Sequence, residues 1–140
     1  MTLDELSRSL PNGFHDAELK TLSLDFIGRQ ARLGLEIWIA AYPEVPGELE
    51  AYRPAEVRLS GLYYWLAEPP DDSYPHWWEG GGRLDVGLLH VLKHQPAIRL
   101  PETPVGAFVN WIFFNSWNAF AYVAAETAEL EWVGDKFIRE

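Results

Sequence analysis

Apolar and polar residues follow a helical period at the start of the chain and a strand period over most of the rest. Leu3, Leu6 and Leu10 fall on one side of a helix, and the spacing of Thr2 and Glu5 is that of a capping box. A Pro-Asn-Gly sequence follows directly and ends the helical pattern. We therefore predict a short N-terminal helix that packs on another part of the protein.

From residue 17 the alternation has a period of two, which is typical of β-strands. Two such runs, 17–26 and 31–39, flank a connection at 27–30 that contains glycine, and together they predict a β-hairpin. Further alternating runs at 57–60 and 84–92 predict two more strands. Gly61 indicates a bulge or a close approach of the backbone.

Three segments rich in proline, glycine or acidic residues separate these strands and predict loops. They cover residues 42–54, 68–82 and 95–104.

Aromatic residues concentrate in the last third of the chain. Residues 107–114 are apolar on both faces, which predicts a strand buried on both sides, and 115–118 predict a turn. Residues 119–128 allow either strand or helix, and the β-branched and aromatic residues that flank them favour strand. The side chains expected in the core include Phe26, Phe108, Phe113, Phe120 and Tyr122.

These elements together predict a mainly β fold. We expect a single antiparallel curved sheet, a sandwich or an open barrel of six to seven strands with a short N-terminal helix. A length of 140 residues, with no repeat or linker, indicates one β-rich domain over 1–140.

Composition excludes several classes of protein. The chain has no cysteine, which removes disulfide scaffolds, thiolate metal sites and cysteine nucleophiles. A net charge of −10 argues against nucleic-acid binding, because phosphate contact needs a basic surface. No signal peptide or membrane-spanning pattern is visible, so we expect a cytoplasmic protein that does not bind membranes.

Recognisable catalytic, cofactor and metal motifs are absent from the sequence. It contains no Gly-x-Ser-x-Gly, no His-Glu-x-x-His and no dinucleotide fingerprint. His90 and His94 have a spacing that suits zinc on a helix, but in a strand they stand about 13 Å apart. We expect neither a cofactor nor a metal, and an enzyme is the less favoured class.

His15 and Asp16 are the first candidate site residues. With Glu18 nearby, they could supply a proton relay or ligands for a divalent metal. In a strand, however, Asp16 and Glu18 would point to one face and His15 to the other. The structural alternative is that Phe14 enters the core while Asp16 caps a turn.

The second candidate site lies in the loop at 71–82. Its residues are Asp71, Asp72, His76, Trp77 and Trp78. Adjacent tryptophans in a loop can stack on a sugar or a planar ligand, or can anchor a protein interface. Alternatively, they fold back over one end of the sheet.

Acidic residues in two loops suggest a charged rim. Glu44, Glu48 and Glu50 with the two aspartates of the second loop would suit a basic partner protein if they share one rim. An ordinary solvated surface is the commoner explanation for such residues.

Three segments of the sequence resemble known bacterial proteins. PNGFHDAEL (11–19), YRPAEVRLSGLYYWLAEPPDD (52–72) and FFNSWNAFAYVAAETAELEW (113–132) resemble a family of small β-rich proteins of undetermined activity that open with an NGFHDA-type segment. The Phe-His-Asp opening is also similar to that of immunity proteins of polymorphic toxin systems. The resemblance implies a mainly β domain and no established catalytic residues.

The sequence therefore favours a non-enzymatic protein-binding or immunity-like module with acidic, aromatic loops. The alternative is a small-molecule binder or enzyme in which an aromatic pocket carries histidine and carboxylate groups. A homodimer formed through the apolar strand at 108–114 is a third possibility.

Overall fold

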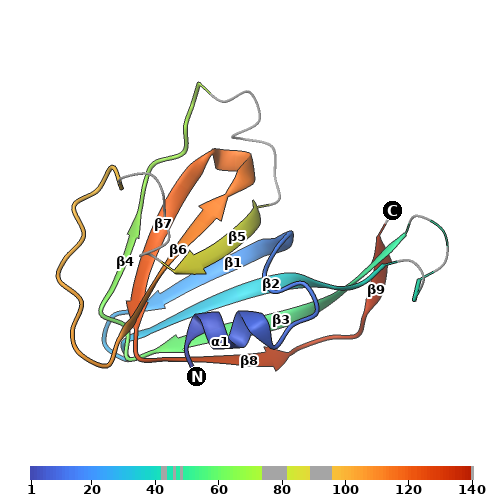
Figure 1. Ribbon diagram of the computed structural model, residues 1–140, viewed down its shortest axis with the longest axis horizontal. Coiled ribbons are helices and arrows are strands. Elements are labelled where there is room, and N and C mark those ends of the chain that lie inside the picture. The colour runs from blue at the N-terminus through green and yellow to red at the C-terminus, as the bar shows by residue number, and fades with distance from the viewer. Residues whose placement is uncertain (42–43, 46, 48, 74–81, 89–95, 140) are drawn as a thin grey trace.

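Most of the chain forms one antiparallel β-sheet in the computed structural model, which describes residues 1–41, 44–45, 47, 49–73, 82–88 and 96–139 (Figure 1). The elements are α1 (Leu3–Arg8), β1 (Ala17–Asp25), β2 (Gln30–Ala40), β3 (Glu50–Ser60), β4 (Tyr64–Ala67), β5 (Gly82–Leu88), β6 (Phe108–Phe114), the 3-10 helix η2 (Asn115–Trp117), β7 (Ala119–Ala125), β8 (Thr127–Trp132) and β9 (Phe137–Arg139). The order in the sheet is β4-β7-β6-β5-β1-β2-β3-β8, and β9 pairs with β3.

The mainly β fold, the N-terminal helix and the first hairpin are confirmed. Thr2 and Glu5 make both hydrogen bonds of the capping box, and β1 pairs antiparallel with β2 around the predicted turn. Residues 119–125 and 127–128 are strand, in β7 and β8, with a bend at 126 between them. Within the described part of the chain nine strands replace the six to seven predicted.

The predicted loop at 42–54 is wrong at its C-terminal end, because β3 already begins at Glu50. Pro54 lies within this strand, at the place where β3 passes from β9, which pairs with residues 50–52, to β8, which pairs with residues 55–60. The Pro54 carbonyl faces this gap and accepts a hydrogen bond from Val133 N. The missing N–H of Pro54 therefore leaves no strand partner unsatisfied.

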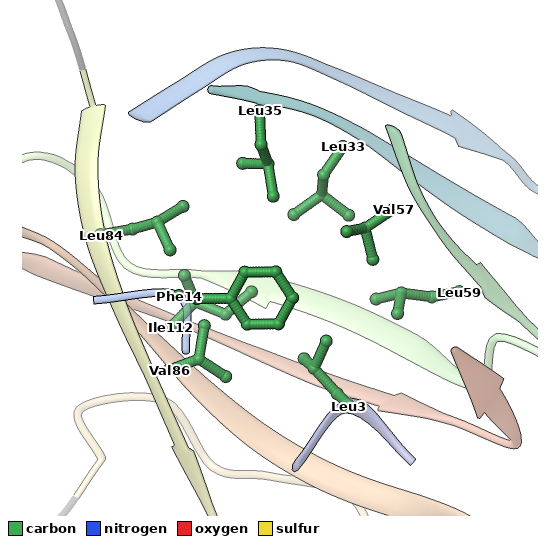
Figure 2. A pocket seen from close by; sticks show the side chains of 9 residues that line it. All are labelled: Leu3, Phe14, Leu33, Leu35, Val57, Leu59, Leu84, Val86 and Ile112. Atoms are coloured by element: carbon green, nitrogen blue, oxygen red, sulfur yellow. The ribbon is translucent and has the colours of Figure 1, made fainter. Parts of the chain in front are cut away.

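The sheet curls around α1, and the core lies between them. Helix α1 contacts the neighbouring strands β5 and β6 and also β8, which β1, β2 and β3 separate from β5, so the sheet must bend to bring them to one helix (Figure 1). Inward side chains converge there with Phe14 from the segment after α1 (Figure 2). The gap that remains among them is about 10 Å³ and is lined only by apolar groups, so it offers a water no hydrogen-bond partner.

At Gly61 the chain bends sharply, and two paired stretches of chain continue around a corner of the sheet. One stretch forms β3 and then β4, and the other forms β7 and then β8. The two stretches pair before and after the corner, which they pass at Gly61 and Glu126. Gly61 has φ of 65°, and a Cβ there would lie 2.6 Å from a carboxylate oxygen of Glu126. The predicted close approach of the backbone at this glycine is therefore confirmed.

Only two of the five aromatic side chains expected in the core are buried. Phe108 and Tyr122 are buried, as expected. Phe26 is 82% exposed, because β1 ends at Asp25 and the side chain lies in the turn beyond it. Phe113 and Phe120 are only half-buried, since they lie on the face of the sheet that points away from α1. We call this face the outer face.

None of the helices among the described residues has the length and apolar character that crossing a bilayer requires.

Candidate functional site

Three neighbouring strands form a groove on the outer face. On β6, residues 108, 110, 112 and 114 are buried, so Trp111 and Phe113 point outward. The strand register places Phe113 between Asp85 of β5 and Phe120 of β7. These four side chains line a shallow depression of about 240 Å³, which we call the outer-face groove.

The aromatic rings of the groove are inclined to one another. The ring centroids of Phe113 and Phe120 are 4.7 Å apart with an angle of 54° between the planes. Trp111 meets Phe120 edge to face, at 5.8 Å and 74°. Inclined rings form walls rather than one flat platform, so the groove suits a compact group better than an extended planar one.

The position of Trp111 depends on a glycine. Gly87 of β5 lies directly opposite Trp111, and a Cβ on Gly87 would be 2.3 Å from the indole Cζ2. The indole therefore occupies the space that a side chain at 87 would fill. From the inner side, Asn110 Nδ2 donates to the Gly87 carbonyl at 2.9 Å and fixes this backbone.

Glu68 anchors the β7 side of the groove. Its carboxylate accepts hydrogen bonds from Phe120 N at 3.0 Å, Tyr122 OH at 3.2 Å and Ala97 N at 3.2 Å. Burial, with the nearby charge of Glu68, raises the pKa of Tyr122 to about 12. The Tyr122 phenol therefore stays neutral, and the Glu68 carboxylate serves to hold these three segments together.

A histidine–carboxylate pair stands at the β5 side. His15 Nδ1 is hydrogen-bonded to Asp85 Oδ1, and His15 Nε2 is 3.6 Å from Asp16 Oδ2. The hydrogen bond to Asp85 raises the pKa of His15 above its usual value. Desolvation opposes this increase in part, and the charges of Asp85 and Asp16 add smaller increases. The histidine is 58% exposed, so it can exchange protons with solvent.

The backbone explains why His15 and Asp16 lie together, although a regular strand would separate them. Asp16 has φ of 60°, a left-handed conformation outside the strand alternation, and β1 begins only at Ala17. Phe14 is buried, as the structural alternative predicted. The structure therefore brings the two residues together, and it adds a main partner, Asp85, that the sequence did not indicate.

We expect the pKa of His15 to fall toward 6.5 in Asp85→Asn, because the amide removes the negative charge and leaves only a weaker, neutral acceptor for the imidazole. A pH titration followed by NMR of the imidazole measures it, with Asp72→Asn, an exposed acid, as the control. Since folding raises this pKa, the stability that His15 contributes is full at low pH and is lost as pH rises through the folded pKa. An unchanged pKa in Asp85→Asn would contradict the pairing.

Asp71 is held by hydrogen bonds within its own segment and to the turn between β6 and β7. Its Oδ1 accepts bonds from Ser73 N and Oγ, its Oδ2 accepts one from Asn118 Nδ2 at 3.0 Å, and its N–H donates to the Trp117 carbonyl. The bonds from Ser73, followed by that from Asn118, lower the pKa of Asp71. Asp71 thus joins its segment to the β6–β7 turn, whereas Asp72 is exposed.

Other predicted site residues lie outside the described part of the chain. They are His76, Trp77 and Trp78, and the histidines whose spacing was considered for zinc, His90 and His94, also lie there. The tryptophan-loop hypothesis therefore stays a prediction. Among the residues that are described, no group of three or more His, Asp or Glu side chains could hold a metal ion.

The described residues of the two acidic loops do not share one rim. Glu50 lies in β3, toward one end of the strand order, whereas the chain of 71–72 follows β4 at the other end (Figure 1). Glu48 lies outside the described residues.

Asp85, Trp111, Phe113 and Phe120 were not expected to form a site. The signal for the aromatic part was the strand that is apolar on both faces, which we interpreted as a strand buried on both sides. Comparison with family models, curated proteins and solved structures finds no match for this chain. The resemblance to small bacterial β-rich proteins and to immunity proteins therefore stays a prediction.

Proposed function

We propose that this protein is a non-enzymatic binding module that receives its partner in the outer-face groove. One observation carries the proposal: three aromatic side chains and one carboxylate line a depression of about 240 Å³ on the face of the sheet away from the core. Aromatic residues around a polar anchor are typical of binding sites in proteins. The groove is large enough for one side chain or one small headgroup.

The chemistry of the groove supports binding rather than catalysis. Its one ionisable lining residue, Asp85, is already paired with His15. Such a pair could act as a general base, but the four lining residues include no hydroxyl, thiol or amine nucleophile. A net charge of −10 further supports a basic protein partner, whose approach it would accelerate. A cytoplasmic, immunity-like role is compatible with this proposal.

A small-molecule ligand is the second candidate. It is favoured by the histidine–carboxylate pair at the edge of the groove, because these groups could orient a polar ligand against the rings.

Mapping with small organic probes tests the location of the site. We expect isopropanol and phenol to shift the NMR signals of the Gly87 amide and the Trp111 indole N–H in a concentration-dependent manner. Gly87→Ala, which displaces the indole, should reduce these shifts, while Gly82→Ala should preserve them. Probes that gather at other surfaces and leave the groove signals unmoved would overturn the proposal.

A further inference from the structure

The outer face already contains a site in which an arginine lies between aromatic rings and carboxylates. The guanidinium of Arg139 lies 4.4 Å from the ring centroid of Tyr52 and 5.5 Å from that of Phe137. It also donates to Glu18 at 2.6 Å and to Glu36. The arrangement combines cation–π contact with charged hydrogen bonds.

Two more arginines stack on rings in this protein. Arg29 lies 4.8 Å from the centroid of Tyr63, and Arg53 lies 4.9 Å from that of Trp132. A guanidinium is planar and weakly hydrated. Its flat face can therefore stack on an aromatic ring while the N–H groups at its edge bind a carboxylate.

The outer-face groove combines aromatic rings and a carboxylate, as the Arg139 site does. Trp111 and Phe113 stand beside the Asp85 carboxylate, and no cation of the described residues stacks on either ring. We propose that the groove binds an arginine side chain of a basic partner protein, with the aromatic walls against the guanidinium and Asp85 as its counter-charge. This inference rests on the proposed function, because it names the group that the groove accepts.

Charge around the groove supports a cationic occupant. Asp16, His15 and Asp85 together carry −2 when the imidazole is neutral and −1 when it is protonated, so the cluster is negative in both states. Asp85 Oδ1 is the atom that pairs with His15, which leaves Oδ2 for a second donor. Arg83, on the same strand as Asp85, is exposed. Its positive charge acts to lower the pKa of Tyr52 on β3, which lies beyond β1 and β2.

A neutral apolar occupant fits less well. It would cover the Asp85 carboxylate without replacing the water it displaces, and burying a charge in that way is costly. A guanidinium replaces those hydrogen bonds and contacts the rings with its flat faces. The net charge of −10 would also draw a basic partner toward the protein from a distance.

The test compares short peptides that differ in one group. Acetyl-Gly-Arg-Gly-amide is titrated into the full-length protein and followed by the signals of the groove. Its citrulline counterpart is the neutral isostere, and guanidinium ion is the free cation. We expect the arginine peptide to bind about tenfold more tightly than the citrulline peptide, and Asp85→Asn to remove most of this difference. Asp72→Asn should bind like the wild type.

Each other outcome has a separate meaning. If citrulline binds in the groove as well as arginine does, the cationic ligand is wrong while the groove remains a binding site. If free guanidinium binds as tightly as the peptide, the assignment to a partner side chain is wrong. If no peptide moves the groove signals, this inference is overturned, and the organic probes decide separately whether the proposed function survives.

Discussion

Phe14→Ala should lower the free energy of unfolding by about 3–5 kcal/mol. Phe14 is 2% exposed and fills the space between α1 and the curled sheet, where the remaining gap is only about 10 Å³ (Figure 2). Truncation there removes the ring from the core and leaves a cavity that the surrounding strands cannot close. Urea denaturation measures the change.

Phe26→Ala is the matched control, because it makes the same chemical change at a side chain that is 82% exposed. It should alter the free energy of unfolding by no more than about 0.5 kcal/mol. Equal losses in the two variants would contradict the placement of the core.

Gly87→Ala should both destabilise the protein and change the groove. The new methyl group would lie 2.3 Å from Trp111 Cζ2, so the indole must move. We expect a loss of about 1–3 kcal/mol in the free energy of unfolding, as for overpacked sites, and a large shift of the Trp111 indole signal. Denaturation and NMR spectra of the same samples report the two effects.

Gly82→Ala provides the comparison on the same strand, because its Cβ would meet its nearest described neighbour, Leu19, at an ordinary 3.6 Å. This variant should keep the stability and the indole signal of the wild type. If Gly87→Ala does the same, Trp111 does not lie over Gly87 as described, and the wall of the groove is misplaced.

The sequence predicts the local elements well because their causes are local. The capping box of Thr2 and Glu5 and the period of two in β1 and β2 are each contained in a few consecutive residues. The start of β3 could not be predicted, because Pro54 fits a strand only through the gap between β8 and β9, which distant parts of the chain create.

The candidate site was predicted in part, and the reason is again the distance along the chain. His15 and Asp16 stand out as neighbouring polar residues, but Asp85 reaches them only because β1 and β5 pair across the sheet. Alternation in β6 indicates two apolar faces and cannot tell which of them the core covers. The outer face of Trp111 and Phe113 therefore became visible only with the strand order.

Nuclear Overhauser effects test most directly the central claim that the outer-face groove binds an arginine side chain. With acetyl-Gly-Arg-Gly-amide bound, nuclear Overhauser effects should connect the arginine δ-methylene protons to ring protons of Trp111 and Phe113, and Asp85→Asn should weaken them. Overhauser effects to aromatic rings elsewhere, or a saturable affinity with none at these two rings, would contradict the account.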